Sequence, residues 1–254
     1  MKSNDLRIIA LESRYEIVKL FRTTAFVIPT LTFPVLFYLL FGVLMGSRMR
    51  GGETSVYLIA TYGAFGVIGA ALSSFGASIA LERGQGLLQL KHATPMPLRA
   101  YMVAKLAAAM LFSAIIVLSL FAAGAIFSGV RFEPLQFGTL FASLVAGTVP
   151  FALLGLTLGY LVSAQASIAV LNLIYLPMSF LSGLWVPIDF LPSAVQKIAS
   201  WLPPFHLAQL ALEAIGQRTR GTPSEHVIAL TGFALLFAAT SIIAYRLDRR
   251  RNYA

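Results

Sequence analysis

The sequence predicts an all-α membrane protein that crosses the bilayer six times. Of its 254 residues, 58% are hydrophobic and only 11% are charged, whereas about a quarter of the residues of a soluble domain are charged. Runs without Asp, Glu, Lys or Arg cover 54–81, 106–130, 134–188 and 227–245, and roughly 20 helical residues cross a bilayer core of about 30 Å. The period-two alternation typical of a membrane β-barrel is absent from these runs.

We place the six predicted spans in one transmembrane domain covering residues 1–254. The run 134–188 is too long for one helix, and its small and polar residues 163–167 predict a turn at the membrane surface. Within that run, Gly155 and Gly159 form a GxxxG pair that allows helices to approach closely. We expect the spans to hold no charged residue. The six predicted spans are residues 25–45, 55–80, 104–128, 136–162, 167–187 and 226–245.

An amphipathic helix is predicted over residues 5–22, ahead of the first span. Its two faces differ in polarity, which predicts a helix lying on the membrane surface. A helix packed against another subunit is the alternative. Charges throughout the first 22 residues argue against a cleaved signal peptide. The polar stripe holds Asp5, Glu12, Glu16 and Lys19, and the apolar face holds Ile8, Leu11, Tyr15 and Val18.

The distribution of Lys and Arg predicts which side of the membrane each loop occupies. With six spans, thirteen of the 19 basic residues fall on the side of both termini and six on the other. Because basic residues concentrate in cytoplasmic loops, we expect an inner-membrane protein with both termini in the cytoplasm. The net charge of +9 is then explained by loops that face anionic lipid, and nucleic-acid binding is not expected.

The predicted external segment 188–215 is too apolar for a free loop, yet its charges and prolines argue against a further span. We expect two short re-entrant helices that break near Pro203-Pro204 and dip into the outer membrane surface. Trp185 and Trp201 would lie near the interface, with a plain aromatic anchor as the alternative. The candidates for a path or gate are Asn172, Ser179, Trp185, Trp201 and Phe205, although the two polar ones can also simply bond a neighbouring helix.

Several kinds of chemistry lack their residues in this chain. There is no cysteine, and the histidines at 92, 206 and 226 are too scattered to suggest a shared metal. No G-x-x-x-x-G-K-[ST] phosphate loop occurs, so we expect no cofactor in this chain and no ATP hydrolysis by it. A gradient-driven carrier usually keeps titrating groups inside its spans. That carrier and a membrane-embedded lipid-modifying enzyme remain the two alternatives to an ATP-driven transporter.

The predicted cytoplasmic loop 82–103 is rich in turn and charged residues, and a short helix is expected around 85–93. Its sequence resembles the segment that follows the second span in membrane subunits of ABC-2-type transporters. Residues 181–215 are similar to that family's run before the last span. One departure is Gly84-Gln85-Gly86-Leu87, where the family commonly shows Gly-Thr-Leu. The residues that carry the loop resemblance are Glu82, Gly84, Gly86, Leu88, Leu90, Thr94, Pro95 and Lys105.

The resemblance implies the permease subunit of an ATP-driven ABC exporter, working as two permeases with two ATPase subunits that bind ATP and Mg. It implies that the loop sits in a socket on the ATPase and transmits ATPase closure to the spans. A hydrophobic or amphiphilic substrate, drug-like or lipid-like, would leave the cytoplasm or inner leaflet between the two permeases, with the external segment as an outer lid. The expected coupling residues are Glu82, Arg83, Gly84, Gly86, Leu88, Lys91, Thr94 and Pro95.

Overall fold

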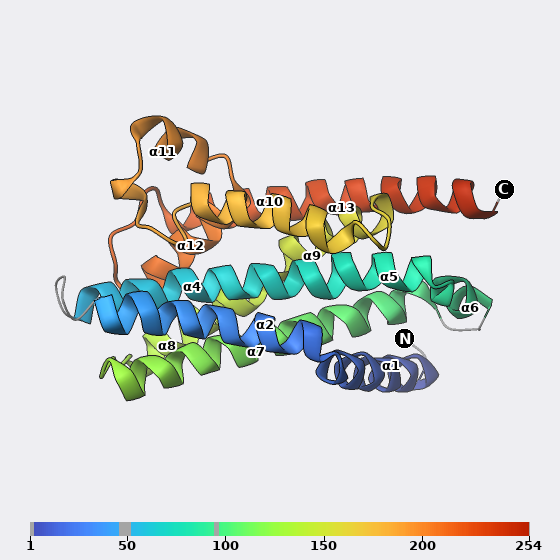
Figure 1. Cartoon of the computed structure of the whole chain (residues 1–254), viewed down its shortest axis with the longest axis horizontal. Helices are drawn as coiled ribbons and strands as arrows, with labels where there is room; N and C mark the ends of the chain where they lie inside the picture. The colour runs from blue at the N-terminus through green and yellow to red at the C-terminus, as the bar shows by residue number, and fades with distance from the viewer. Residues whose placement is uncertain (1–2, 46–51, 94–96, 254) are drawn as a thin grey trace.

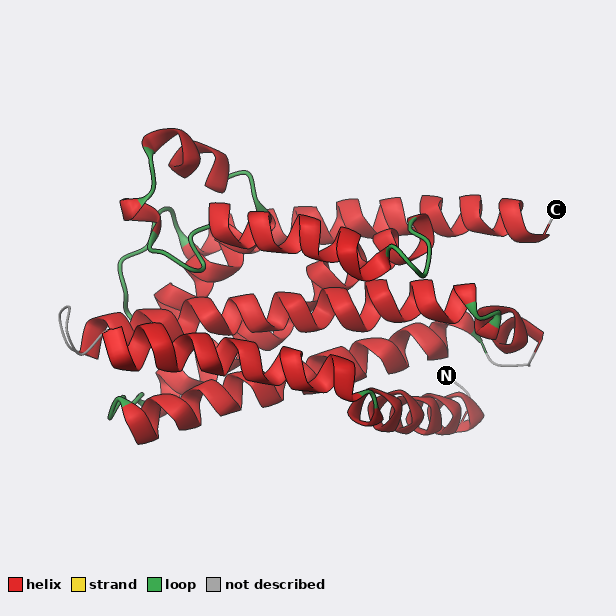
Figure 2. Cartoon of the chain, in the orientation of Figure 1, coloured by secondary structure: helices red, strands yellow, loops and turns green. Residues whose placement is uncertain are grey.

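The computed structural model describes residues 3–45, 52–93 and 97–253, and the ordered elements in these ranges are helices, with no strand. Figure 2 shows helices joined by short loops along the described chain. Five of them are long and apolar enough to cross a membrane: Phe26–Leu44, Thr54–Gly84, Leu98–Phe127, Pro134–Leu161 and Pro223–Arg249. The prediction of an all-α membrane protein is therefore confirmed.

The first half of the chain begins with α1 (Ser3–Arg22), the predicted amphipathic helix. The first two spans each contain a π-helical segment, in which one turn is wider than in an α-helix. The elements are α2 (Thr24–Phe37) continuing into η1 (Tyr38–Met45), then α4 (Gly52–Leu72), η2 (Ser73–Ala77) and α5 (Ser78–Gly84), and after a turn α6 (Leu87–Ala93).

The second half begins with α7 (Leu98–Phe127), a single helix of 30 residues. The elements that follow are α8 (Pro134–Ala146), α9 (Thr148–Leu161), α10 (Ser167–Leu181), the 3-10 turn η3 (Ile188–Phe190), α11 (Ser193–Ala199), α12 (Pro203–Ala214) and α13 (Pro223–Tyr253). Residues 162–166, between α9 and α10, form the predicted turn inside the long uncharged run.

The long helices lie side by side along the long axis of the molecule, as Figure 1 shows. The N- and C-termini lie at one end together with α1 and α6, and we call this the α6 end. The short helix α11 lies at the opposite end, which we call the α11 end. The side of the membrane that each end faces stays a prediction.

The count of six spans also stays a prediction, because α10 has only 15 residues. At 1.5 Å per residue, such a helix is roughly 22 Å long, shorter than a bilayer core of about 30 Å. Arg48 and Arg50, predicted to be external, lie outside the described residues.

The outer segment forms the two short helices that the sequence predicts, with α12 starting at Pro203. Proline is favoured there because the first turn of a helix does not use its N–H groups. Of its apolar side chains, Phe205 is buried in the protein at 4% exposure, while Phe190 is 78% and Trp201 81% exposed. The re-entrant position of this segment in the membrane stays a prediction.

The core centres on the second long helix, Thr54–Gly84, because 72% of its most apolar stretch is buried, whereas only 11% of that of Pro223–Arg249 is buried. The predicted close approach at Gly155 and Gly159 takes place against η2. A Cβ at Gly159 would come 2.9 Å from the carbonyl oxygen of Gly76, and one at Gly155 would come 3.1 Å from the Gly76 nitrogen. The glycine pair therefore allows α9 to touch the π-helical backbone of the second span.

Candidate functional site

The segment 82–103 forms a helical corner at the α6 end. Helix α5 ends at Gly84, and Gly86 adopts a φ of +73°, a conformation that glycine adopts without strain. A Cβ at Gly84 would come 2.7 Å from the Cβ of Ala164, so glycine also allows the corner to approach the 162–166 turn. The short helix expected around 85–93 is observed at Leu87–Ala93. Thr94 and Pro95 lie outside the described residues.

Glu82 lies at the centre of a buried ionic cluster. Its side chain accepts hydrogen bonds from Lys105 Nζ at 2.7 Å, Ser78 Oγ at 2.9 Å and Tyr101 OH at 2.5 Å, and it pairs with Lys19. Lys105 also donates to Ser78 Oγ at 2.8 Å. Glu82 and Lys105 are each 2% exposed. The cluster joins α5 to the first turns of α7.

This arrangement corrects the expectation that the spans hold no charged residue. Lys105 lies inside the predicted span 104–128, and Glu82 lies inside the long apolar helix Thr54–Gly84. Both charges are accommodated in the protein because each has a partner of opposite charge and further hydrogen bonds. Without such partners, burial of a charge costs several kcal/mol.

Helix α1 completes the ionic cluster with its polar stripe. Glu16, 1% exposed, accepts from Lys105 Nζ at 3.1 Å and from Lys91 Nζ at 3.3 Å, and Lys91 also pairs with Glu12. The polar face of α1 thus packs against α6 and α7. The apolar residues Leu11 and Tyr15 are 57% and 58% exposed on the helix surface, which supports a position against lipid.

The ionic cluster contains three carboxylates and three ammonium groups. They are Glu12, Glu16, Glu82, Lys19, Lys91 and Lys105. Burial alone would lower the pKa of Lys91, but hydrogen bonding to Glu12 and the charge of Glu16 outweigh it and raise that pKa. Lys91 Nζ also lies 4.3 Å from the centre of the Tyr101 ring. Lys91 therefore stays charged and holds α6 to α1.

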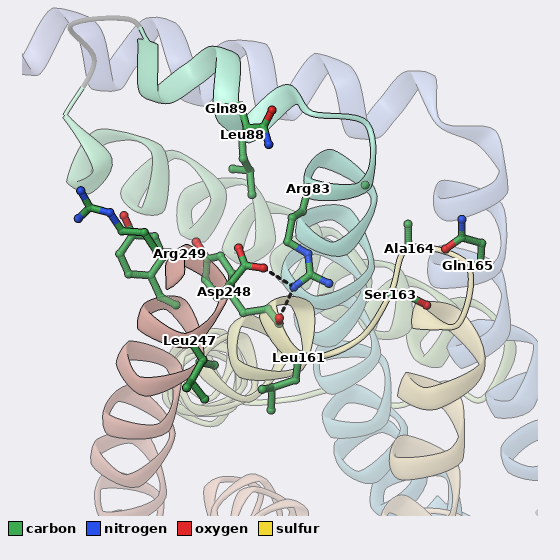
Figure 3. Close-up of a pocket in the computed structure, with 14 residues that line it drawn as sticks. Arg83, Leu88, Gln89, Leu161, Ser163, Ala164, Gln165, Leu247, Asp248 and Arg249 are labelled. Carbon is green, nitrogen blue, oxygen red and sulfur yellow. Dashed lines mark hydrogen bonds and ion pairs between the residues drawn. The ribbon is translucent and has the colours of Figure 1, made fainter. Parts of the chain in front are cut away.

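Arg83 connects the same corner to the opposite side of the bundle. Its guanidinium donates to the carbonyl oxygens of Tyr160 and Val162 at the end of α9, and it pairs with Asp248 of α13 at 3.0 Å. Figure 3 shows Arg83 between the last turns of α13 and the chain leaving α9. A cavity of about 550 Å³ lies beside it. Adjacent residues 82 and 83 thus connect the corner to α1, α7, α9 and α13.

The predicted coupling residues differ from the side chains that α6 presents outward. Glu82 and Leu88 are buried, at 2% and 4% exposure, so neither side chain is presented to a partner. The side chains that α6 presents outward are Leu87 at 38% and Leu90 at 65% exposure, with Gln89 also exposed. None of Leu87, Gln89 and Leu90 was among the expected coupling residues, and their exposure is what identifies the outward face.

The predicted path and gate residues occupy different environments. Asn172 is exposed on α10, whereas Ser179 of the same helix is fully buried, and its Oγ has no hydrogen-bond partner among the described residues. Trp185 belongs to an aromatic cluster, with ring centres 5.9 Å from Phe37, 5.6 Å from Phe65 and 6.3 Å from Phe180. Trp201 is exposed and Phe205 buried. Their roles as path or gate residues stay predictions.

Two of the three scattered histidines meet at the α11 end, which the sequence analysis missed. Nδ1 of His206 on α12 lies 2.9 Å from Nδ1 of His226 on α13, and His206 Nε2 lies 3.1 Å from the carbonyl oxygen of Ser200. Because a carbonyl only accepts, His206 carries its proton on Nε2 and accepts from His226 at Nδ1. The described residues contain no group of three or more metal-ligating side chains. The two histidines are 20 residues apart in the sequence, and no local sequence pattern predicts that they pair.

The fold and the ionic cluster define a polytopic helical membrane protein in which the corner between α5 and α6 is held to several other helices. Comparison with protein families identifies the chain as a member of the ABC-2 type transporter family, whose pattern matches residues 9–215. A relative in Bacillus subtilis (strain 168), which carries the name transport permease YvfS, is 24% identical over 240 residues. That match covers 93% of this chain and 96% of the relative. The chain is therefore a transporter membrane subunit.

Proposed function

We propose that this chain is the permease subunit of an ATP-driven exporter, and that α6 receives the movement of a separate ATPase. The observation that carries the proposal is the connection of the α5–α6 corner to α1, α7, α9 and α13 through ion pairs and hydrogen bonds. Glu82 and Lys91 hold the corner to α1 and α7, and Arg83 holds it to α9 and α13. A displacement of α6 would move these helices together.

The ionic cluster suits the transmission of movement because it is buried and geometrically specific. Separating a buried ion pair leaves unpaired charges in a poorly polar interior, which is strongly destabilising. The corner and its partners would therefore move as a body. The π-helical η2 between α4 and α5 provides a place where the second span can bend, since such segments interrupt regular helical hydrogen bonding.

The outward face of α6 is the proposed contact for the ATPase. Leu87 and Leu90 offer apolar area at the centre of such a contact, and the polar Gln89 lies between them in sequence. In this proposal the α6 end faces the cytoplasm of a cell whose inner membrane holds the protein. Two ATPase copies, carrying ATP and Mg, would act on two copies of the permease.

The proposed substrate is hydrophobic or amphiphilic, drug-like or lipid-like, and leaves between the two permeases. The aromatic cluster around Trp185 supports an apolar substrate, since it places several rings at the junction of α2, α4 and α10. The exposed Trp201 and Phe190 of the outer segment supply apolar area from which an outer lid could be built.

A gradient-driven carrier and a lipid-modifying enzyme remain distinguishable alternatives. The charges at Glu82 and Lys105 are of the kind a carrier uses, but each lies in an ion pair at the α6 end of its helix. Family membership argues for ATP-driven transport instead. Transport that continues after ATP depletion, with the membrane gradient intact, would favour the carrier.

Association with the ATPase tests the proposal directly. We expect Leu90→Ala to weaken copurification with the ATPase and to lower substrate-stimulated ATP hydrolysis several-fold. Thermal unfolding should change little, because Leu90 is 65% exposed and exposed substitutions usually cost under about 0.5 kcal/mol. Leu11→Ala is the matched control, since Leu11 is 57% exposed on α1. Equal association and hydrolysis in both variants would contradict the proposed contact.

Labelling of single introduced cysteines tests the orientation of the chain in the membrane. Because the sequence contains no cysteine, there is no background labelling. A cysteine at the exposed Gln89 should react only with reagents that enter the cell, and one at the exposed Arg218 should react from outside. Labelling of position 89 by an impermeant reagent in intact cells would reverse the proposed topology.

A further inference from the structure

The cavity at the α6 end has the chemistry of a lipid site, and we propose that it binds the headgroup of an anionic phospholipid. It has a volume of about 550 Å³ and lies between α6, the 162–166 turn and the last turns of α13. The inference goes beyond transport by the chain, because it concerns the lipid that surrounds the protein.

The cavity has a polar side and an apolar side. Gln89, Ser163, Gln165 and Arg249 contribute polar groups, and Gln89 belongs to α6 on the side away from the spans. Leu161 and Leu247 line the opposite side, toward the spans, and are 55% and 49% exposed. A ligand that fits both sides must be amphiphilic, with its polar group toward α6.

The apolar side of the cavity continues along α13. Leu236 and Ile243, on the same face of α13 as Leu247, are 53% and 57% exposed, and only 11% of the most apolar stretch of this helix is buried. Such a surface lies in acyl chains when the helix spans a membrane. An acyl chain on α13 and a headgroup in the cavity are therefore compatible with one lipid molecule. This continuity favours a lipid over a segment of a protein partner.

The charges at the cavity favour an anionic headgroup. Arg83 pairs with Asp248 and donates to two carbonyl oxygens, so these two groups balance each other. Arg249 adds a positive charge at the cavity and is exposed. Tyr160 and Tyr245 line the same cavity, and tyrosine is enriched at the level of lipid headgroups. A phosphate beside Arg249 would gain a charge-assisted hydrogen bond there.

The test uses the purified full chain in a neutral detergent, with phosphatidylglycerol as the probe and phosphatidylcholine as the comparison. We expect phosphatidylglycerol to raise the thermal unfolding midpoint and native mass spectrometry to retain it on the chain. Arg249→Gln should weaken its binding about fivefold, as expected for one basic residue at a membrane surface. Gln89→Glu, which adds a negative charge at the cavity, should weaken it as well.

Arg246→Gln is the matched control. Arg246 lies one turn before Arg249 on α13 but does not line the cavity. It is exposed, and its substitution removes the same charge from the same helix. Binding of phosphatidylglycerol by Arg246→Gln should equal that of the unmodified chain.

Three results would overturn the inference. Equal losses in Arg249→Gln and Arg246→Gln would mean that a diffuse basic surface attracts the lipid. Equal binding of phosphatidylcholine would mean that headgroup charge is not recognised. Binding of soluble glycerol phosphate as tight as that of phosphatidylglycerol would indicate a free-anion site, without a role for α13. Failure of the ATPase proposal would change none of these readouts.

Discussion

Lys105 is the residue on which the ionic cluster most depends, because it pairs with both Glu16 and Glu82 while only 2% exposed. Removing one member of a buried ion pair leaves its partner charged and poorly solvated. The burial of Glu82 also changes what its substitution would report. Glu82→Ala is expected to impair folding as well as coupling, so Leu90 is the better probe of the ATPase contact.

We expect Lys105→Met to destabilise the protein by about 3–5 kcal/mol, the usual cost of breaking a buried ion pair. The measurement is thermal unfolding in detergent followed by circular dichroism. Lys197→Met is the control, since Lys197 is exposed on α11. A Lys105→Met protein as stable as the Lys197→Met protein would show that the ionic cluster contributes nothing to stability.

The histidine pair predicts a pH dependence at the α11 end. Burial and the neighbouring His226 lower the pKa of His206. The folded state therefore binds a proton at His206 less tightly than the unfolded state does. The stability that this contributes is fully present above the ordinary histidine pKa of about 6.5 and is lost as the pH falls through that value toward the lowered pKa.

Thermal unfolding at pH 8 and pH 5.5 checks this sign. The unmodified chain should unfold at a lower temperature at pH 5.5, and His206→Gln should reduce the difference because it removes the group that titrates. An unchanged difference between the two pH values in His206→Gln would assign the effect to other groups.

Contact between helices α9 and η2 depends on backbone proximity. A Cβ added at Gly159 would lie 2.9 Å from the carbonyl oxygen of Gly76. A methyl group there must push backbone apart, because no flexible side chain can yield. The GxxxG pair thus acts within one subunit, where it holds α9 against the π-helical part of the second span.

Gly159→Ala is expected to destabilise the protein by about 1–3 kcal/mol, the usual cost of overpacking. Gly232→Ala on α13 is the control, since no atom lies within 4 Å of its added Cβ. That variant should be neutral or slightly stabilising, because alanine favours a helix more than glycine does. The measurement is the thermal unfolding midpoint of each variant. Equal midpoints for Gly159→Ala and Gly232→Ala would contradict the close contact between α9 and η2.

The whole molecule leaves apolar side chains exposed at the α11 end, with Trp201 at 81%. In the proposed assembly of two permeases, the outer segments lie near their shared path. Trp201→Cys should then form a cross-link between two copies and stop export while ATP binding to the ATPase continues. Ile126→Cys is the control, since Ile126 is 72% exposed at the end of α7.

Figure 1 shows that the end of α7 and the helix α11 lie on opposite sides of the α11 end. Cross-linking through position 126 is therefore not expected within the same pair. Export that continues after complete cross-linking at position 201 would remove the lid from the proposal and leave Trp201 as an interfacial anchor.

The sequence by itself determined the helical membrane fold, the positions of the long helices, the two helices of the outer segment and the corner at 84–86. These features follow from local properties, since hydropathy, proline and glycine act within a few residues of where they occur. The family resemblance also rested on short stretches of sequence. Local patterns were sufficient for each of these predictions.

The tertiary structure decided which faces these helices present. Lys19 meets Glu82 across 63 residues and Arg83 meets Asp248 across 165, so neither pair leaves a local pattern. The same packing buries Leu88, exposes Leu90, turns the polar stripe of α1 inward and brings His206 to His226. The physical reason is that a buried charge is stable only beside a partner, and that partner is chosen by how distant helices pack.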